Sequence, residues 1–483
     1  MWCNELAKPQ KHPGGEIMMT DNVAEIKSKI TNIDITDENL TGRAGLTFIS
    51  RYLRATKIPE LLGTKFSYLR KSSKGTKLSS IFHQILCYFI NGDNFHLTYF
   101  DQLKSDSGYT GVVEIPEKQM ISSHSAKRFF KSFSMPQALQ LRKILHMLFI
   151  WQLKKQKPEK IILGLDTMVM DNDDALRREG VDPTYKKVKG FQPIHLYWGR
   201  FIIDTIFRNG KAHSNHGNNV KRIIVSAVRL IRKHYSTEVP IVLLADTGFF
   251  DEAIFKLCNE LNIGFIIGGK MYDDIKQTVV ETPDDNFYEY KIGKRLWYFL
   301  DFTDSRGSWD TTYRCIYTKP ISDKAGQILL EFDRPESILY TNLGMENEAS
   351  WKLMEINNTS SIEPEVIIAA YHNRARDELV NRAFKDFGTE QMPLKRFAAN
   401  SAFYYLMAIS FFLFESFKSD MNNDAIPTTW YPETFRRRFI DLAGKIVYSG
   451  RRITLKLTAL FFNLFNLSEL WIKSVSLNPV LII

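Results

Sequence analysis

The sequence predicts a mixed α/β protein with helical N- and C-terminal regions and a β-rich insertion that interrupts its central sheet. Three observations lead to this prediction. Apolar residues recur at helical spacing up to about residue 157. Short apolar runs of strand length then alternate with amphipathic segments, an order that predicts a sheet built from a meander and crossover units. Further strand-like runs follow, separated by Gly, Asp, Ser and Pro residues that favour turns.

The composition is that of a globular protein with a basic surplus. Of its 483 residues, 44% are hydrophobic and 24% are charged, which excludes a mainly disordered, collagen-like or disulfide-scaffold protein. The formal charge of +10 favours an acidic partner such as nucleic acid. The four cysteines form no Cys-x-x-Cys pair, so we expect a reducing cytosol and no zinc site. The most apolar stretch, 403–414, is shorter than the roughly 20 residues of a bilayer span, so we expect a buried helix and no membrane.

Changes of pattern along the chain divide it into parts. The expected parts are a flexible tail (1–39), a helical DNA-binding domain (40–157), the first part of the sheet core (158–269), the β-rich insertion (270–361), a helix that completes the core (362–400) and a helical C-terminal region (401–483). The strands expected in the core and insertion are 160–166, 191–198, 201–207, 241–246, 264–268, 287–300, 312–317 and 328–332. Pro364 opens a long helix that runs to about Phe387, where Gly388 stops it.

The helical domain contains a weak helix-turn-helix pattern. Ser122 can cap a short helix, and a longer helix follows from about 136 to 154. The first helix would present Lys127, Arg128 and Lys131 to DNA. A plain helical bundle with a solvated basic face remains an equal alternative.

Two apolar runs of strand length each end in an aspartate, Asp166 and Asp246. Ligands of open α/β sheets gather beyond the carboxyl ends of the strands, where a buried strand has no structural need for a carboxylate. Two converging carboxylates repel each other unless a cation lies between them. Mg²⁺ prefers oxygen ligands, and two such ions support phosphoryl transfer. Taken singly, each aspartate is more often a turn residue or a helix cap, and Asp204 is a competing ligand candidate.

The predicted helix after Pro364 carries Tyr371, Arg374, Glu378 and Lys385. At about 100° per residue, these four side chains lie within a roughly 60° arc of one helix face. Arg and Lys bind phosphates and Tyr supplies a hydroxyl, so this face suits a nucleic-acid backbone. A solvated face with intrahelical ion pairs is the alternative interpretation. Asp377 is the rival acid, about 100° away from this stripe.

The order of these features resembles that of the DDE transposases of bacterial insertion sequences. Two strands each end in an acid, a β insertion follows, and the next helix carries a glutamate. The spacing of the four helix residues resembles the signature of the insertion-sequence-four superfamily, and within it the chain is most similar to the thirteen-eighty group. The resemblance covers about residues 40–457. It includes Leu-Gly-Leu-Asp-Thr at 163–167, Lys-Gly-Phe at 189–191, Ala-Asp-Thr-Gly-Phe at 245–249 and the basic residues from 435 to 452.

The resemblance implies an RNase H-like core and a DNA transposase. Asp166, Asp246 and Glu378 would hold two Mg²⁺ ions, for which Mn²⁺ would substitute. The enzyme would cut the terminal inverted repeats, and the freed 3′-hydroxyl would attack target DNA or the opposite strand, without a covalent protein–DNA intermediate. It would act as a homodimer on paired ends, in the bacterial cytoplasm at the nucleoid.

The resemblance also implies which side chains contact DNA. Tyr371, Arg374 and Lys385 would position the phosphates of the transposon end. In relatives that make hairpins, an aromatic residue of the insertion stacks on a flipped base, a contact worth about 1–3 kcal/mol. Trp297 is the candidate for this role and Trp309 the second. The competing interpretation is that Trp297 packs inside the insertion, as aromatic residues usually do.

The C-terminal basic residues give a further prediction. Arg437, in the run 436–438, and Arg451 are expected to bind DNA, given the positive net charge. Three alternatives to a transposase stay open. They are an RNase H-like nuclease without strand transfer, an inactive DNA-binding descendant of a transposase, and a basic globular protein whose acids are structural.

Overall fold

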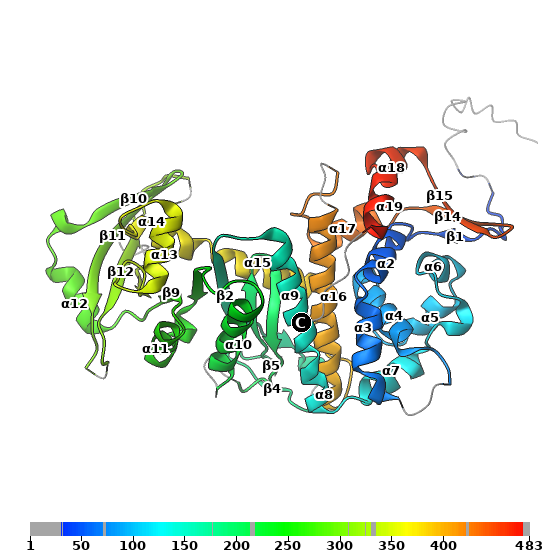
Figure 1. Cartoon of the computed structure of the whole chain (residues 1–483), viewed down its shortest axis with the longest axis horizontal. Helices are drawn as coiled ribbons and strands as arrows, with labels where there is room; N and C mark the ends of the chain where they lie inside the picture. The colour runs from blue at the N-terminus through cyan, green and yellow to red at the C-terminus, as the bar shows by residue number, and fades with distance from the viewer. Residues whose placement is uncertain are drawn as a thin grey trace, which may run out of the picture. The chain divides into compact units, whose positions relative to one another are not determined.

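The structure is a computed structural model that describes residues 30, 32–70, 74–175, 177–212, 218–307, 309–323, 325–329, 335–421 and 425–476. Residues 1–38 form a unit of their own, and its described residues contain no helix or strand. The tail predicted over 1–39 therefore lies mostly outside the described residues. The chain from Asn39 onward is one compact unit (Figure 1).

A nine-stranded mixed sheet forms the centre of this unit, with strand order β10-β11-β12-β13-β9-β8-β2-β6-β7. Its core strands are β2 (Ile161–Thr167), β6 (Ile194–Trp198), β7 (Phe201–Ile206), β8 (Ile241–Ala245) and β9 (Gly264–Gly268). β2 pairs antiparallel with β6 and parallel with β8, which in turn is parallel to β9. This meander followed by crossovers confirms the mixed α/β class, and it is the order of an RNase H-like core.

The insertion extends the same sheet. Its strands are β10 (Tyr288–Ile292), β11 (Arg295–Asp304), β12 (Tyr313–Pro320) and β13 (Ser337–Thr341), and β13 pairs antiparallel with β9. The single strand expected over 287–300 is wrong, because Gly293 adopts φ 60° and turns the chain into a hairpin. β13 and the helices α12 (Asp273–Glu281) and α13 (Glu348–Asn357) were not predicted. Of the expected strand 328–332, only 328 and 329 are described, and Ile328 forms an isolated bridge to Ser322.

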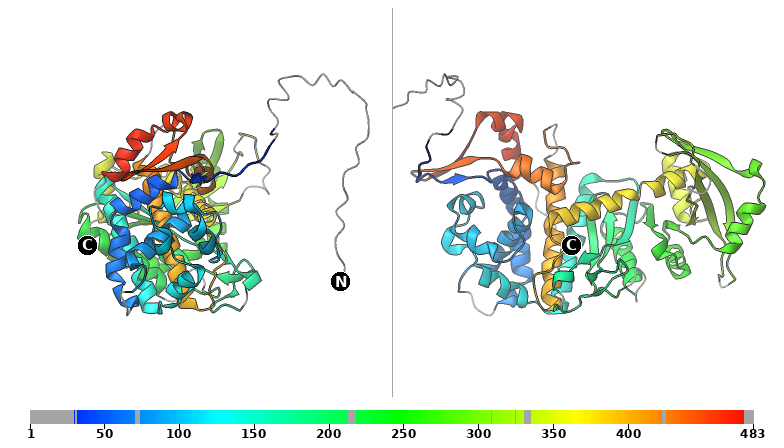
Figure 2. Two further views of the ribbon diagram at one scale, coloured as in Figure 1. Left: turned by 90° about the vertical axis from the view of Figure 1, so that its right-hand side faces the viewer. Right: turned by 180° about the vertical axis from the view of Figure 1, so that it is seen from behind.

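Helices cover both faces of the sheet. α10 (Asn219–His234) and α11 (Glu252–Glu260) lie on one face, and α14 (Pro364–His372) and α15 (Ala375–Phe387) lie on the other (Figures 1 and 2). Apolar residues of α14 pack against Val242 and Leu244 of β8. A small sheet of β3 (Met170–Asp171), β4 (Asp182–Pro183) and β5 (Lys189–Phe191) extends the β2–β6 ribbon.

The N-terminal region is helical, as predicted. Its helices are α2 (Leu46–Ala55), α3 (Ile58–Lys65), α4 (Leu78–Asn91), α5 (Tyr99–Ser105), α6 (Ser107–Val112), α7 (Ser123–Lys131), α8 (Met135–Gln140) and α9 (Arg142–Gln156). The Ser122 hydroxyl caps α7, since it accepts the Ser125 amide at 3.3 Å. The single helix expected over 136–154 is instead α8 and α9, because the amides of Leu141 and Ile144 bond only three residues back.

The helix α16 (Phe397–Asp420) runs through the helical part of the fold. By length and composition it could cross a membrane, but 89% of its apolar window is buried inside the protein. The buried helix expected at 403–414 is therefore confirmed. The C-terminal region continues with α17 (Pro432–Phe435), a π-helical turn (Arg436–Ile440), α18 (Ala459–Leu464) and α19 (Leu467–Val475). It also contains the hairpin β14 (Gly444–Ser449) and β15 (Arg452–Leu457), which pairs with β1 (Leu40–Thr41).

Candidate active site

The structure brings the two strand acids side by side. Leu165 of β2 stands opposite Ala245 of β8 in a parallel register. The next residue along the chain is an aspartate in both cases: Asp166 within β2, and Asp246 directly after the end of β8. Neighbouring strands lie about 4.8 Å apart, and residues in register point to the same face. The pairing predicted from the two strand-ending acids is therefore present at the carboxyl ends of adjacent parallel strands.

The raised pKa of Asp166 shows that its carboxylate is destabilised by burial and repelled by the neighbouring acids. Burial and, next, the carboxylate of Asp246 raise the pKa of Asp166 to about 6, and Glu378 adds to the rise. The Thr167 amide, which donates to the Asp166 carboxylate at 2.7 Å, and the Arg374 guanidinium oppose it. Because the ionised form of this carboxylate is disfavoured in the protein alone, the site suits a bound cation that would stabilise the negative charge.

Asp204 is an acid of the same sheet whose charge is compensated by neighbouring side chains. It is 1% exposed and accepts two hydrogen bonds from Arg142, at 2.8 and 2.6 Å. Although burial opposes it, His146 and Arg142 hold the pKa of Asp204 well below its usual range. Asp204 is thus fully compensated within the fold, and it does not compete with Asp166 as a ligand candidate.

The helix that carries the four-residue motif is not continuous. The amides of Arg374 and Asp377 bond only three residues back, to Tyr371 and Arg374, so the chain passes from α14 to α15 between His372 and Ala375. The long helix expected over 365–387 is therefore two helices. Tyr371 belongs to the first, Arg374 lies at the junction, and Glu378 lies in the second.

Arg374 lies close enough to both strand acids, and Tyr371 close enough to Asp246, for their charges to interact. A side-chain carbon placed on Gly268 would lie 2.5 Å from the Tyr371 hydroxyl and 2.8 Å from Thr247, which follows Asp246. The Arg374 guanidinium lies 5.6 Å from the centre of the Tyr371 ring. One buried nitrogen of that guanidinium, Nη1, has no hydrogen-bond partner among the described residues. This donor is available to an anionic group that enters the site.

Two neighbouring acids on α15 differ in their surroundings. Asp377 is 8% exposed and lies against Gly164, where an added side-chain carbon would be 1.9 Å from its Oδ2. Burial, followed by the charges of Asp166 and Glu378, raises the pKa of Asp377 to about 7. Glu378 is exposed, but it is close enough to raise the pKa of both aspartates.

The donor chemistry of this region fits a hard cation such as Mg²⁺, because the side chains are carboxylates and lie together at the strand ends. Asp166 and Asp246 are adjacent, and Glu378 interacts with Asp166 electrostatically. Among the described residues, however, no three ligand side chains are gathered closely enough to form a complete metal site. The third acid is thus near the pair but not assembled with it.

In the metal-free protein, Asp377→Asn should raise the thermal midpoint at pH 8 and change it less at pH 5. The folded-state pKa of about 7 lies above the ordinary value of 3.8, so the folded state retains the proton more strongly. Wild-type stability therefore falls as the pH rises from about 4 through about 7, by a few kcal/mol at most. Thermal unfolding in EDTA across this range checks the prediction. A variant that is less stable at pH 8 would contradict it.

Asn381, which the sequence reading missed, connects Asp166 to a buried hydrogen-bond network. Its amide nitrogen donates to the Asp166 carboxylate at 3.1 Å, and its oxygen accepts from the Tyr197 hydroxyl at 2.5 Å. His195 lies 3.0 Å from the same oxygen and also hydrogen-bonds to Tyr404 of α16. Asn381 lies three residues beyond Glu378, on the same side of α15, which is the one sequence signal that could have found it.

For the metal-dependent DNA cleavage that the resemblance implies, Asn381→Ala should slow the reaction by about 10–100-fold and raise the Mg²⁺ concentration needed for half-maximal rate. Partners that orient a ligand typically have effects of this size. Tyr404→Phe is the matched control, since it cuts the far end of the network and leaves the contact to Asp166. An unchanged Mg²⁺ dependence in Asn381→Ala would show that the amide does not position the carboxylate.

Tyr185 was also missed, because nothing in the surrounding sequence marks it. It lies in the turn between β4 and β5 and is 58% exposed. Partial burial and, next, Asp166 and Asp246 raise the pKa of its phenol. Its ring is thus within electrostatic reach of the acid pair.

The predicted DNA contacts lie in different environments. Lys385 is paired with Glu390 at 2.7 Å. Trp297 is 7% exposed, with the Arg295 guanidinium 4.2 Å and the His372 ring 4.6 Å from its ring centre. Trp309 packs against the rings of Phe250, Phe255, Tyr313 and Tyr340. The packing interpretation of Trp297 matches this structure, and its stacking on a base stays a prediction.

The remaining predicted contacts lie on other elements. Lys127 is half-buried and Arg128 exposed on α7, and Arg451 is exposed in the turn between β14 and β15. The Arg437 side chain is 74% exposed and paired with Glu433. Within the part of the chain that the structure describes, no recorded contact links these four residues to the strand acids. Their binding to DNA stays a prediction.

Comparison with known proteins gives a match to a family model and a distant likeness to a solved structure. A family model described as "Transposase DDE domain group 1" matches residues 23–465. Among solved structures, the chain is similar to a piggyBac transposase synaptic complex with hairpin DNA, with 11% identity and a TM-score of 0.39 over 92% of this chain and 85% of that chain. That likeness is too distant to support fold or function. No curated protein matches the chain.

Proposed function

Because the chain belongs to the family of transposase DDE domains, we propose that it cleaves the ends of a transposon and joins them to target DNA. Asp166, Asp246 and Glu378 are its catalytic acids in this proposal. The observation that carries it is the in-register placement of Asp166 and Asp246 at the ends of β2 and β8, with the pKa of Asp166 raised to about 6. Asp204 is neutralised by cations that bond to it directly, whereas among the described residues Asp166 accepts only from an amide of the backbone and the amide of Asn381.

The three acids would hold divalent metal, whose use the family implies, and we propose Mg²⁺ with Mn²⁺ as a substitute. When bound, such ions supply charge neutralisation at the reacting phosphate and activation of the attacking oxygen. Asn381 keeps the Asp166 carboxylate oriented toward the site through its 3.1 Å hydrogen bond. Carboxylates fixed on two adjacent strands need little reorganisation when the phosphate arrives.

The DNA itself would be held by Tyr371 and Arg374. The unpartnered Nη1 of Arg374 and the Tyr371 hydroxyl lie beside the acids and can donate to phosphate oxygens. Water attacks the phosphorus at the transposon end, and the bond to the 3′ oxygen breaks, leaving a 3′-hydroxyl and a 5′-phosphate. That hydroxyl then attacks a target phosphodiester and displaces its 3′ oxygen. The first step hydrolyses one phosphodiester, the second exchanges one phosphodiester for another, and neither step needs a protein nucleophile.

The proposal also covers the group of transposases to which the chain belongs, its oligomeric state and where it works. We place the chain in the insertion-sequence-four superfamily, in its thirteen-eighty group, on the spacing of Tyr371, Arg374, Glu378 and Lys385. We further propose a homodimer on paired terminal repeats, working on DNA in the bacterial cytoplasm.

The experiment that tests this function uses a labelled duplex with the element's terminal repeat and a supercoiled target plasmid. We expect nicking at the repeat boundary in Mg²⁺ but not in EDTA, followed by joining of the labelled end to the plasmid. Nicking without joined product would establish a nuclease that lacks strand transfer. Binding without nicking in either condition would establish an inactive descendant.

A further inference from the structure

The helix α10 has an unusually one-sided charge. Its sequence contains five Lys and Arg residues and no Asp or Glu. Six apolar residues of the helix, from Val220 to Ile231, are buried against the fold. The opposite side is exposed, and four of the cations lie there: Lys221, Arg222, Arg229 and Lys233. We call this exposed side the α10 basic face.

Among the described residues, the four cations of this face are unpaired. In the part of the chain that the structure describes, none of the four takes part in a recorded ion pair or side-chain hydrogen bond. The fifth cation, Arg232, is different, because it donates to the Val239 carbonyl at 2.5 Å. The acid near this end of the helix, Glu238, is already bound by Lys352 at 2.8 Å. The charge of the basic face is therefore not neutralised by the fold.

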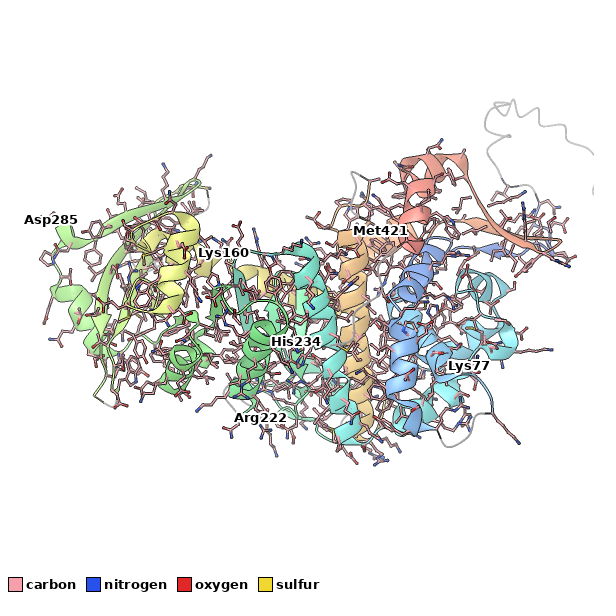
Figure 3. The ribbon with its side chains drawn as sticks, viewed as in Figure 1. Lys77, Lys160, Arg222, His234, Asp285 and Met421 are labelled. Carbon is pink, nitrogen blue, oxygen red and sulfur yellow. The ribbon has the colours of Figure 1, made fainter. Side chains whose placement is uncertain are left out.

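The spacing of the cations suits a run of phosphates. Arg222, Ser226, Arg229 and Lys233 follow one another at intervals of four, three and four residues, which places them on one stripe. They border a shallow hollow of about 710 Å³ along the helix. At 1.5 Å per residue the stripe is about 16 Å long, the length of about five base pairs. Figure 3 shows Arg222 and His234 near opposite ends of this helix.

The α10 basic face lies on the other side of the sheet from the candidate active site. Asp166, His195 and Tyr197 face α15, which contacts them through Asn381. Asp204 pairs with Leu196, and the side chains of both point to the opposite face of the sheet. On that face Arg142 and His146 of α9 bind the Asp204 carboxylate, and α9 packs against α10. Figures 1 and 2 show the same separation of α10 and α15. Because the two surfaces are on opposite faces of the sheet, α10 is open to a DNA segment other than the one whose phosphate enters the active site.

We propose that the α10 basic face binds the phosphate backbone of a double-stranded DNA segment other than the one being cut. The inference rests on the proposed function, because the overall charge of +10 and the DDE family both favour DNA as the acidic partner. Arg and Lys contacts to phosphates are independent of sequence and weaken with salt. Two sources fit this chemistry equally: the target DNA, and transposon DNA further from the cut end.

The test compares two triple variants of the full chain that remove the same charge. The first, R222Q/R229Q/K233Q, changes only exposed residues of the α10 basic face to a good helix former, so the fold should be retained. The control, K256Q/K276Q/K473Q, removes three cations that are paired with carboxylates on other helices. Binding of a long duplex of random sequence is measured against salt concentration. Each lost phosphate contact should lower the slope of log K against log salt by about 0.9.

We expect the α10 variant to lose about two to three units of slope and at least tenfold in affinity, and the control to lose little. If cutting of a short end duplex is unchanged but joining to a plasmid falls, the bound segment is target DNA. If lengthening the transposon end no longer improves binding, it is transposon DNA. An unchanged slope, or an equal loss in the control, overturns the proposal. Wild-type protein that cuts no DNA would instead refute the proposed function, while the slope comparison would still decide the role of α10.

Discussion

Glu378→Gln should reduce cleavage of a transposon-end duplex by at least about 1,000-fold while binding of the same duplex persists. The amide keeps the size of the side chain but removes the charge that would help to hold divalent metal at Asp166 and Asp246. Metal ions stabilise phosphoryl-transfer transition states by several kcal/mol, and each 1.36 kcal/mol corresponds to a factor of ten in rate. Single-turnover nicking in Mg²⁺, with binding measured in EDTA, checks both parts of the prediction.

Asp377→Asn is the matched control, one residue away on the same helix. Asp377 is buried against Gly164, and burial raises its pKa to about 7. We expect this variant to keep most of the cleavage activity. If instead Asp377→Asn abolishes nicking and Glu378→Gln does not, the third catalytic acid is Asp377, and the spacing of the helix motif has assigned the wrong neighbour.

The pair of strand acids could be predicted from sequence because the signal is local. Apolar runs that end in an acid identify Asp166 and Asp246, and the parallel order of such strands places their ends at one edge. The third acid is harder, because the choice between Asp377 and Glu378 depends on how α15 is rotated against β2. The junction at Arg374 changes that rotation, and no residue there is a helix breaker such as Pro or Gly.

Contacts between distant elements could not be predicted from sequence at all. Asn381 has no motif of its own, and its role arises only because α15 packs over β6. The run Arg436-Arg437-Arg438 gives three identical residues with no local difference in pattern. The structure separates them: Arg436 is 8% exposed, whereas the Arg437 side chain is 74% exposed. A basic run can thus hold one structural arginine among the surface cations.

The buried arginine connects two parts of the fold. The Arg436 guanidinium donates to the carbonyls of Phe89 and Ile90 at the end of α4, at 2.9 and 3.0 Å. It also donates to the carbonyls of Asp386 and Phe387 at the end of α15, at 3.1 and 2.5 Å. Helix carboxyl ends carry unpaired carbonyls and partial negative charge, so one cation satisfies both. Arg436 therefore fixes the helix that carries Glu378 against the N-terminal helical region.

Arg436→Met should lower the free energy of unfolding by about 3–5 kcal/mol, the usual cost of removing one partner of a buried charged interaction, because four carbonyls lose their charged donor. Arg437→Met is the control, and the loss of its exposed pair with Glu433 should cost no more than about 0.5 kcal/mol. Denaturant unfolding of both variants, with hydrogen exchange at the end of α15, measures the difference. Equal losses in the two variants would assign the effect to the π-helical turn rather than to the guanidinium. A negligible loss at Arg436 would mean that water replaces it at the carbonyls.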